Sequence, residues 1–406
     1  MDFLKGIRVV SFNHFLFGPV GMQILGDLGA DVIAVEPPGG AFQRKWGGMD
    51  IKTVDGQTML FLLGNRNKRS IAIDLKTPEG LEVARRLVRE ADVVCENFRP
   101  GVMEKLGLGY DQVREHNPSV IYATASGYGA DGPYKDRPGQ DLIVQAMSGL
   151  AAITGDARSG PRAIGGSIVD HHGASLLAMG ILAALFRRTA SGQGCRVDVS
   201  LLSAAIDLQI EPFACFLNGE RPDSVELPNP HSGGWYFPAP YGIYPSSDGY
   251  MAISLSSVSL MAEALSEPRL NQFKDTEDYS RRDEITELVA EVIKTKTCAQ
   301  WAEILTRHKV WHTVVNDYGD VVADPQVVHN GTFVTVPGAT GTPVTLVSHP
   351  VKYDGQTPEV RLPPQRIGAQ TDDILAELGY SADEIAGLEK QGAILRLAAQ
   401  DEAQPQ

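Results

Sequence analysis

A strand–helix–strand pattern at residues 7–36, IRVVSFNHFLFGPVGMQILGDLGADVIAVE, decides the expected fold. Short apolar runs at 7–12 and 31–36 flank a segment at 18–28 whose apolar residues recur at helical spacing. The alternation continues downstream, with strand-like runs at 70–74, 92–96 and 120–125 and a helical segment at 77–90. Because strands alternate with helices at this spacing, we expect an α/β fold with a parallel sheet and crossover helices.

The rest of the chain predicts buried helices and a second, smaller unit. Two apolar helices are expected at 140–154 and 173–188, both buried because they are apolar nearly all round. A linker at 218–234 precedes a hairpin pattern at 241–255. Further helices are expected at 281–296, 298–308 and 372–378, and further strands at 331–337 and 342–348.

Composition and charge exclude several classes of protein. The chain has 36 Lys and Arg against 50 Asp and Glu, a net charge of −14, which argues against nucleic-acid binding and against an anionic membrane surface. The longest apolar stretch, 173–186, is too short to span a bilayer, and the first residues lack a basic signal region. Four scattered cysteines without a C-x-x-C pair suit a reducing compartment. We therefore expect a cytoplasmic protein.

Three common kinds of site find little support in the sequence. The turn after residue 12 lacks the G-x-G-x-x-G pattern of a nicotinamide or flavin site. Asp170, His171 and His172 are consecutive and point about 100° apart on a helix, so they do not chelate one metal ion. Residues 165–167 lack the spacing of a serine nucleophile elbow. We expect no metal and no permanently bound cofactor.

Asp170 lies just before the long apolar helix expected at 173–188, three positions after the glycine-bearing stretch 165–167. An aspartate in this position often caps the helix by accepting hydrogen bonds from free backbone amides. The same carboxylate, partly removed from water, can instead attack an activated acyl group, with nearby amides stabilising the oxyanion. The residues alone leave both roles open.

Nine short motifs, taken in order, make the sequence resemble the class III CoA-transferases, the family that includes formyl-CoA:oxalate transferase, carnitine CoA-transferase and α-methylacyl-CoA racemase. The similarity covers nearly the whole chain, and the order of the motifs carries it because each alone is weak. The motifs are LKGIRVV at 4–10, LGADVI at 28–33, NKRSI at 67–71, DLKTPEG at 74–80, ENFRPG at 96–101, SGYG at 126–129, QAMSG at 145–149, GILAAL at 180–185 and SGQG at 191–194.

The resemblance implies that Asp170 is the covalent nucleophile, because the family's nucleophilic aspartate lies shortly before the GILAAL segment. It also implies that coenzyme A binds as a substrate to the early loops, where cationic side chains screen its phosphates. Asp141 is expected to orient a neighbour, and 231–234 to close over the site as a lid. The CoA-binding residues implied are Leu16, Phe17, Ile73, Asp74, Leu75, Lys76, Asn97, Phe98, Arg99, Lys105, Arg137, Pro138, Gly139 and Gln140.

The family resemblance also implies an architecture. It predicts a Rossmann-like large domain with a parallel sheet, a smaller α+β domain, and an interlocked homodimer. In this sequence the large domain would comprise 1–225 together with a return segment at 331–406, and 226–330 would form the small domain. The partners implied are an acyl-CoA and a small free carboxylic acid.

Two departures from family patterns bear on the reaction. Leu16 stands where formyl-CoA:oxalate enzymes carry glutamine, which argues against oxalate as the acceptor. Gln140 stands where racemases carry a histidine, one half of the acid–base pair that epimerises an α-carbon. The sequence therefore favours exchange of CoA between an acyl-CoA and a small acid. A racemase or isomerase and a non-catalytic CoA-binding protein are the alternatives.

Overall fold

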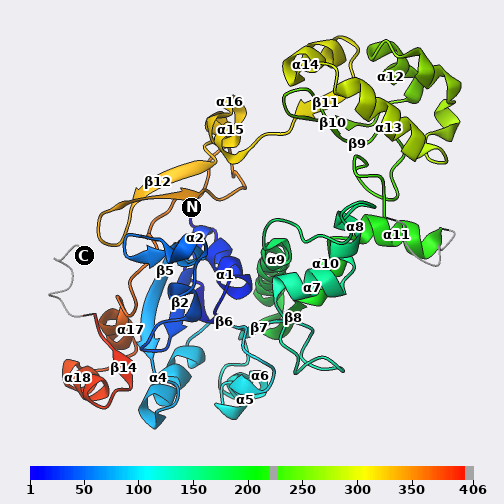
Figure 1. Ribbon diagram of the computed structural model, residues 1–406. Coiled ribbons are helices and arrows are strands. Elements are labelled where there is room, and N and C mark those ends of the chain that lie inside the picture. The colour runs from blue at the N-terminus through cyan, green and yellow to red at the C-terminus, as the bar shows by residue number, and fades with distance from the viewer. Residues whose placement is uncertain (220–226, 398–406) are drawn as a thin grey trace. The chain divides into compact units, whose positions relative to one another are not determined.

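The computed structural model describes residues 1–219 and 227–397, which form two compact units (Figure 1). The larger unit comprises Met1–Val144, Ser167–Leu208 and Val328–Gln406, and the second comprises Gln145–Gly166 and Gln209–Val327. Each unit is therefore assembled from separate stretches of chain. The domain boundaries expected after residues 225 and 330 stay a prediction, and 145–166 lies in the second unit.

A seven-stranded sheet, in the order β14-β5-β2-β1-β6-β7-β8, forms the centre of the larger unit. Six strands are parallel, which confirms the predicted parallel sheet, although β8 was not predicted, and the short β14 pairs antiparallel with β5 at one edge. The fold is thus a mixed α/β fold dominated by a parallel sheet. The strands are β1 (Arg8–Phe12), β2 (Asp31–Glu36), β5 (Lys68–Ile73), β6 (Val93–Glu96), β7 (Ile121–Ser126), β8 (Cys195–Ser200) and β14 (Ile394–Leu395).

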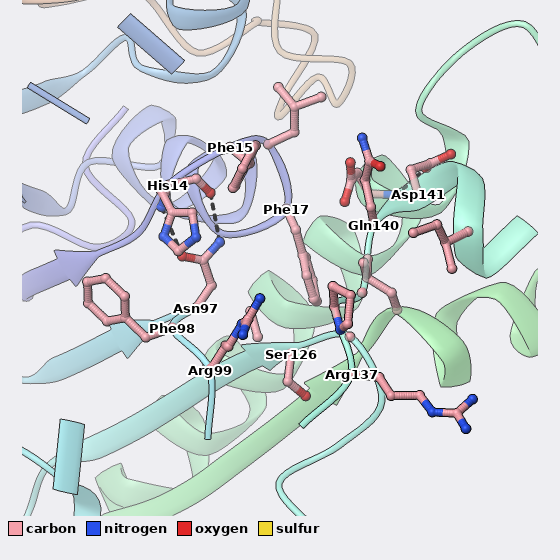
Figure 2. Close-up of a pocket in the computed structure, with 18 of the residues that line it drawn as sticks. His14, Phe15, Phe17, Asn97, Phe98, Arg99, Ser126, Arg137, Gln140 and Asp141 are labelled. Carbon is pink, nitrogen blue, oxygen red and sulfur yellow. Dashed lines mark hydrogen bonds between the residues drawn. The ribbon is translucent and has the colours of Figure 1, made fainter. Parts of the chain in front are cut away.

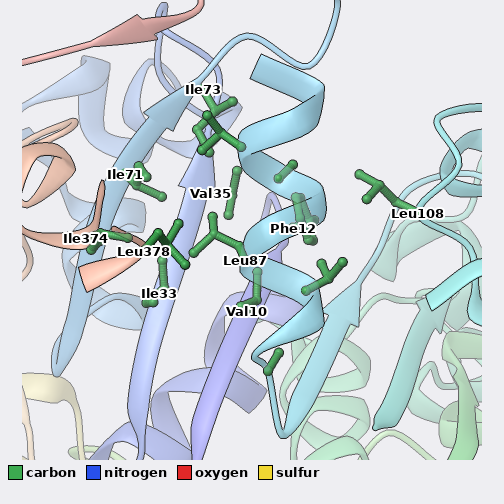
Figure 3. Packing of buried hydrophobic residues seen from close by; sticks show 14 of the residues in the cluster. Val10, Phe12, Ile33, Val35, Ile71, Ile73, Leu87, Leu108, Ile374 and Leu378 are labelled. Atoms are coloured by element: carbon green, nitrogen blue, oxygen red, sulfur yellow. The ribbon is translucent and has the colours of Figure 1, made fainter. Parts of the chain in front are cut away.

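The main apolar core of this unit joins the two ends of the chain. Side chains of β1, β2 and β5 pack with Leu87 of α4 (Pro78–Arg89) and Ile374 of α17 (Thr371–Glu377), as Figure 3 shows. Helix α4 begins at its expected position because the Thr77 side chain accepts the N–H of Gly80 and caps it. Residues from the far end of the sequence therefore complete the sheet's core.

Further elements surround the sheet. The first helix, α1 (Phe17–Asp27), follows β1 directly, as predicted. The others in this unit are α2 (Gly48–Ile51), β3 (Thr53–Val54), β4 (Gln57–Thr58), α3 (Met59–Gly64), α5 (Val102–Lys105), α6 (Tyr110–His116), α10 (Leu201–Asp207), β12 (Phe333–Pro337), β13 (Pro343–Val347) and α18 (Ala382–Lys390), with a 3-10 turn at Phe42–Arg44.

The two apolar helices differ from their predicted form. The single helix expected at 140–154 is two, α7 (Asp141–Met147) and α8 (Leu150–Thr154), because Gly149 between them has φ 87°. Helix α9 (Ile168–Ser191) is longer than predicted, and only one of its faces is buried, while Phe186 on it is 81% exposed. Among the described residues, α9 alone has the length and composition to cross a membrane, a test that core helices of soluble proteins also pass.

The second unit contains an antiparallel sheet, β9 (Gly242–Pro245), β10 (Tyr250–Ser254) and β11 (Trp311–Val314), with helices that bury Trp301 fully. The hairpin predicted at 241–255 and the helices predicted at 281–296 and 298–308 are confirmed. The helices are α11 (Ile210–Asn218), α12 (Val258–Ala264), α13 (Arg282–Ile293), α14 (Cys298–Arg307) and α15 (Tyr318–Ala323), and α16 (Pro325–Asn330) spans the boundary between the units.

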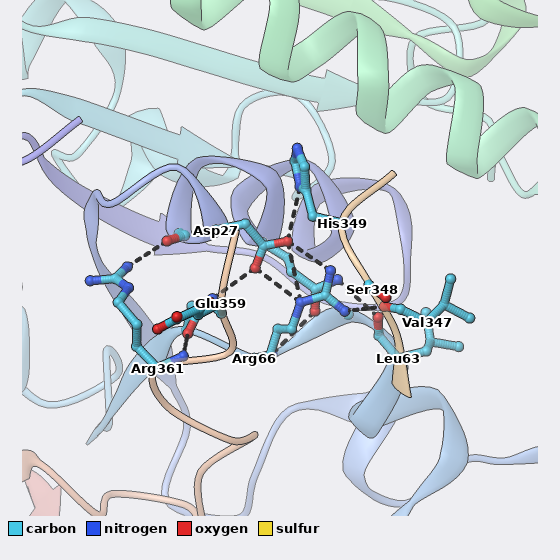
Figure 4. Close-up of polar contacts among 12 residues, drawn as sticks. Asp27, Leu63, Arg66, Val347, Ser348, His349, Glu359 and Arg361 are labelled. Atoms are coloured by element: carbon cyan, nitrogen blue, oxygen red, sulfur yellow. Dashed lines mark hydrogen bonds and ion pairs between the residues drawn. The ribbon is translucent and has the colours of Figure 1, made fainter. Parts of the chain in front are cut away.

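A buried polar cluster ties the return segment to α1 in the larger unit (Figure 4). The Asp27 carboxylate accepts hydrogen bonds from the Arg66 guanidinium at 2.7 and 2.9 Å and from Asn67 at 2.8 Å. His349 lies 3.2 Å from the same carboxylate, and Arg361 donates to the carbonyl oxygen of Gly26. These bonds keep the pKa of Asp27 below its ordinary value despite its burial.

Candidate active site

One cavity of the larger unit lies where parallel α/β sheets usually bind ligands. Strand β2 pairs with one side of β1 and β6 with the other. The order in which the chain adds strands to the sheet therefore reverses between β1 and β6, although the strands stay parallel. The loops that follow these two strands line a cavity of about 490 Å³. Its other walls come from the end of β7, from the loop before α7, and from Ser167 and Asp170 at the start of α9.

Reciprocal hydrogen bonds hold the two loops together at this point. The His14 N–H donates to Oδ1 of Asn97 at 2.9 Å, and Nδ2 of Asn97 donates to the His14 carbonyl at 2.7 Å, as Figure 2 shows. On the opposite wall, a Cβ on Gly127 would lie 2.7 Å from the Cα of Gly139, so only glycine permits this approach of two backbones. The cavity is therefore shaped by the backbone before any ligand enters.

Asp141, rather than Asp170, caps helix α9. Oδ2 of Asp141 accepts the backbone N–H groups of Val169 at 2.8 Å and of Asp170 at 3.0 Å. The residue at the N-cap position, Ser167, makes no capping bond with its side chain. Within the described residues the Asp170 carboxylate accepts no hydrogen bond. Of the two roles left open by the sequence, capping thus falls to Asp141, and the Asp170 carboxylate faces the cavity unpaired.

The surroundings of Asp170 disfavour its ionised form. Burial raises the pKa of Asp170 to about 7, and the negative charge of Asp141 adds to the effect. Near neutral pH the group is therefore divided between a carboxylic acid and a poorly solvated carboxylate. A carboxylate with few solvent bonds and no protein donor is a stronger nucleophile than one in water.

Three cations line the same cavity, Arg99, Lys135 and Arg137. None of them forms an ion pair with an acid in the described part of the chain, and Arg137 lies over the ring of Tyr134. Unpaired guanidinium and ammonium groups beside a cavity are typical of sites that bind anions such as phosphates. The cavity thus combines an unpaired acid with a cationic wall.

Most of the expected CoA-binding residues meet in this cavity. Those that line it are Leu16, Phe17, Asn97, Phe98, Arg99, Arg137, Pro138, Gly139 and Gln140, together with Asp170. Five others do not line it, namely Ile73, Asp74, Leu75, Lys76 and Lys105. Ile73 is fully buried in the core, so its side chain is not available to a ligand there. Contacts of 73–76 and of Lys105 with CoA stay predictions for parts of the coenzyme outside the cavity.

Several lining residues were missed by the sequence prediction. They are His14, Phe15, Trp46, Pro100, Ala125, Ser126, Gly127, Lys135, Ile143, Ser167 and Leu201. The rule that ligands bind at the carboxyl ends of parallel strands points to His14 and Ser126, because they follow or end β1 and β7. Trp46 has no comparable signal, since it lies outside any strand end. No group of three or more His, Cys, Asp or Glu side chains able to hold a metal occurs in 1–219 and 227–397.

Comparison with known proteins assigns the chain to one family. A sequence model of CoA-transferase family III matches residues 4–371. Succinate–glutarate CoA-transferase of Agrobacterium fabrum is 34% identical over 388 residues, covering 92% of this chain and 95% of that protein. Human succinyl-CoA:glutarate CoA-transferase is 30% identical over 401 residues, covering 96% and 90%. The crystal structure of a CaiB/BaiF family protein from Brucella suis has a TM-score of 0.79 at 31% identity, covering 93% of this chain and 99% of that one.

Proposed function

This chain belongs to CoA-transferase family III and transfers CoA between an acyl-CoA and a carboxylic acid, and we propose that Asp170 is the covalent nucleophile. The observation that carries the proposal is the unpaired carboxylate of Asp170 in a cavity with a cationic wall. Asp141 supports it, because it caps α9 and leaves the Asp170 carboxylate available.

The reaction proceeds through three covalent intermediates on Asp170, an anhydride with the donor acid, a thioester with CoA and an anhydride with the acceptor acid. A carboxylate oxygen of Asp170 attacks the thioester carbonyl, the C–S bond breaks, and CoA leaves as a thiolate. The thiolate then attacks the aspartyl carbonyl of the resulting anhydride, which releases the first acid and leaves CoA as a thioester on Asp170. The acceptor carboxylate attacks this thioester, CoA leaves again, and its attack on the acyl carbonyl restores Asp170. One thioester replaces another, so no ATP is required.

The cationic wall is suited to the coenzyme. Arg99 and Arg137 would bind its phosphates, and the Phe98 ring offers an apolar face to the pantetheine arm. Lys76 and Lys105, which lie outside the cavity, would contact the nucleotide end. Coenzyme A is a substrate of this reaction, and the proposed mechanism needs no permanently bound cofactor.

Assembly and location form a second part of the proposal. We propose a cytoplasmic homodimer of the interlocked type, with no nucleic-acid or membrane partner. Its support is the open apolar face of α9 and α10, on which Met179, Phe186 and Ile206 are exposed, since apolar faces of this kind are usually covered in an assembly. The domain division at 225 and 330, and closure of 231–234 over the site, belong to the same proposal.

A panel of acyl-CoA donors and free acids tests the function. The purified protein is expected to form the acceptor's CoA thioester without ATP, and Asp170→Ala is expected to abolish the exchange. Asp111→Ala, which removes an exposed acid from α6, serves as the matched control. Deuterium entering the α-carbon without an added acid would indicate a racemase, and CoA binding without exchange would indicate a binding protein.

A further inference from the structure

Three aromatic rings form a continuous row beside the cavity, which we name the aromatic strip: Phe15 and Trp46, which line the cavity, and Phe42, which packs between them. The ring centroids of Phe15 and Phe42 are 4.5 Å apart, and those of Phe42 and Trp46 are 5.9 Å apart. Each residue is between 41% and 47% exposed. Phe15 and Trp46 line the same cavity as Asp170. Rings of this size are usually better buried, so the strip is available to a ligand.

Buried polar contacts hold the strip in place. Phe15 has φ 59°, a conformation that a bulky side chain rarely adopts. Its N–H donates to Oε1 of Gln43 at 3.1 Å, and Gln43 is only 3% exposed. The Thr58 hydroxyl in turn donates to the Gln43 carbonyl at 2.6 Å. An unfavourable backbone conformation that buried partners maintain is a common feature of ligand sites, where it fixes the position of a side chain before the ligand binds.

The same segment is also anchored to the sheet. Arg44, between the two ring-bearing positions Phe42 and Trp46, forms a two-pronged ion pair with Glu36, the last residue of β2, at 2.5 and 2.7 Å. The Arg44 guanidinium also lies 3.7 Å from the ring centroid of Phe61. Phe15 and the segment that carries Phe42 are therefore held in place by buried groups, and the Trp46 ring packs on Phe42.

Phe15, at one end of the strip, lies on a different side of the cavity from Arg99 and Arg137. In Figure 2 Phe15 is on the upper side of the cavity, whereas Arg99 and Arg137 are on the lower side. Leu16 and Phe17, which follow Phe15 in the chain, add apolar surface to the same wall. The cavity thus has a cationic end and an aromatic end, and an acyl-CoA likewise has a charged end and an acyl end.

Resting on the proposed function, we propose that the aromatic strip binds the ring of an aryl-acyl group, so that aryl-substituted acyl-CoA thioesters are the preferred donors. A planar ring stacks on Phe15 and Trp46 and removes their exposed faces from water, whereas a short aliphatic group leaves them exposed. The adenine of CoA is the other planar group that could stack there, and the experiment separates the two.

The test compares phenylacetyl-CoA with butyryl-CoA as donors. The wild-type protein is expected to show a higher kcat/KM for phenylacetyl-CoA, and Trp46→Ala, which removes a ring that lines the cavity, is expected to lower the ratio of the two kcat/KM values about tenfold. Trp46→Leu, which keeps an apolar side chain but loses the ring, is expected to lower the ratio as well, and it guards against misfolding of the alanine variant. Phe3→Ala removes an exposed ring elsewhere in the larger unit and is expected to change neither donor.

Phenylacetyl-pantetheine, which lacks the nucleotide, distinguishes the two planar groups. Loss of its reactivity in Trp46→Ala supports aryl-acyl binding. If the variant lowers kcat/KM equally for both CoA donors but leaves phenylacetyl-pantetheine unaffected, the strip binds adenine and the proposal is overturned. A wild-type protein that transfers CoA without preferring the aryl donor overturns it too, while the proposed function stands. If neither donor reacts, the dissociation constants of the two donors, measured by calorimetry, decide whether the strip recognises the ring, and the panel of donors and acids decides the proposed function separately.

Discussion

Oδ2 of Asp141 accepts the backbone N–H of Asp170 at 3.0 Å, so one carboxylate holds the amide of the residue whose own carboxylate faces the cavity. The two acids divide two tasks that one residue at a helix start usually combines. Asp141 satisfies the free amides of α9, and its charge helps to raise the pKa of Asp170. The position and the reactivity of Asp170 therefore both depend on Asp141.

Replacing Asp141 by asparagine is expected to change the pH dependence of the enzyme. The nucleophile must be ionised, so kcat/KM in the wild-type protein should rise as the pH passes about 7, the pKa of Asp170. Asp141→Asn keeps an oxygen that accepts the amides but removes the charge, so this rise should move to lower pH. The pH profile of CoA exchange measures the shift, with Asp111→Asn as control. An unchanged midpoint would show that Asp141 does not act on the charge of Asp170.

Replacing Asp170 by asparagine is expected to stabilise the fold above neutral pH. A pKa raised from 3.8 to about 7 means that ionisation of Asp170 costs the folded state roughly 4 kcal/mol, because the unfolded chain ionises more easily. This cost is absent below the unfolded pKa and is complete above the folded one. Asp170→Asn should therefore melt several degrees higher than the wild-type protein near pH 8, and the difference should vanish near pH 4.

Thermal unfolding across this pH range distinguishes the two roles once open for Asp170. A carboxylate that capped α9 would stabilise the helix, so its loss would lower the melting temperature at neutral pH. A lower Tm for Asp170→Asn near pH 8 would thus contradict an unpaired, desolvated Asp170. Asp111→Asn should leave the Tm nearly unchanged, since surface substitutions rarely alter stability.

Local patterns in the sequence predicted the sheet and part of the site. The apolar runs of β1, β2 and β6 mark buried parallel strands, and the loops after β1 and β6 were placed at the site on the motifs that resemble the family. Asp170 was found in the same way, from its place before the GILAAL segment. These features depend on residues that are close together in the chain, which is why sequence patterns reveal them.

Features that depend on distant residues were not predictable from the sequence. Asp141 caps α9 across a separation of 28 or 29 positions, and nothing near Ser167 indicates this partner. The packing of Phe15 on Phe42 and the antiparallel edge strand β14 likewise arise only when distant segments fold together. The break between α7 and α8 was visible as Gly149, but glycine alone does not end every helix.

Loss of the Asp27 carboxylate is expected to destabilise the larger unit strongly. Asp27→Asn leaves the Arg66 guanidinium buried without its anionic partner, which typically costs about 3–5 kcal/mol. Glu90→Gln, which breaks a half-exposed pair with Arg8, should cost about 1 kcal/mol or less. Because the folded pKa of Asp27 is lowered, its contribution is present at neutral pH and is lost as the pH falls below 3.8.

Urea unfolding at neutral and acidic pH measures both effects. The free-energy difference between the wild-type protein and Asp27→Asn should be large at neutral pH and should shrink as the medium becomes acidic. Equal losses of stability for Asp27→Asn and Glu90→Gln would indicate that the cluster in Figure 4 does not hold the return segment in place.

Trapping the covalent intermediate tests directly whether Asp170 is the nucleophile. The protein is incubated with an acyl-CoA that serves as donor, treated with hydroxylamine or borohydride, digested, and analysed by mass spectrometry. The modified side chain is expected to be Asp170, Asp141 in the same digest is expected to be unmodified, and Asp170→Ala is expected to yield no adduct and no exchange. Full exchange by a folded Asp170→Ala protein, or an adduct on another side chain, would contradict it.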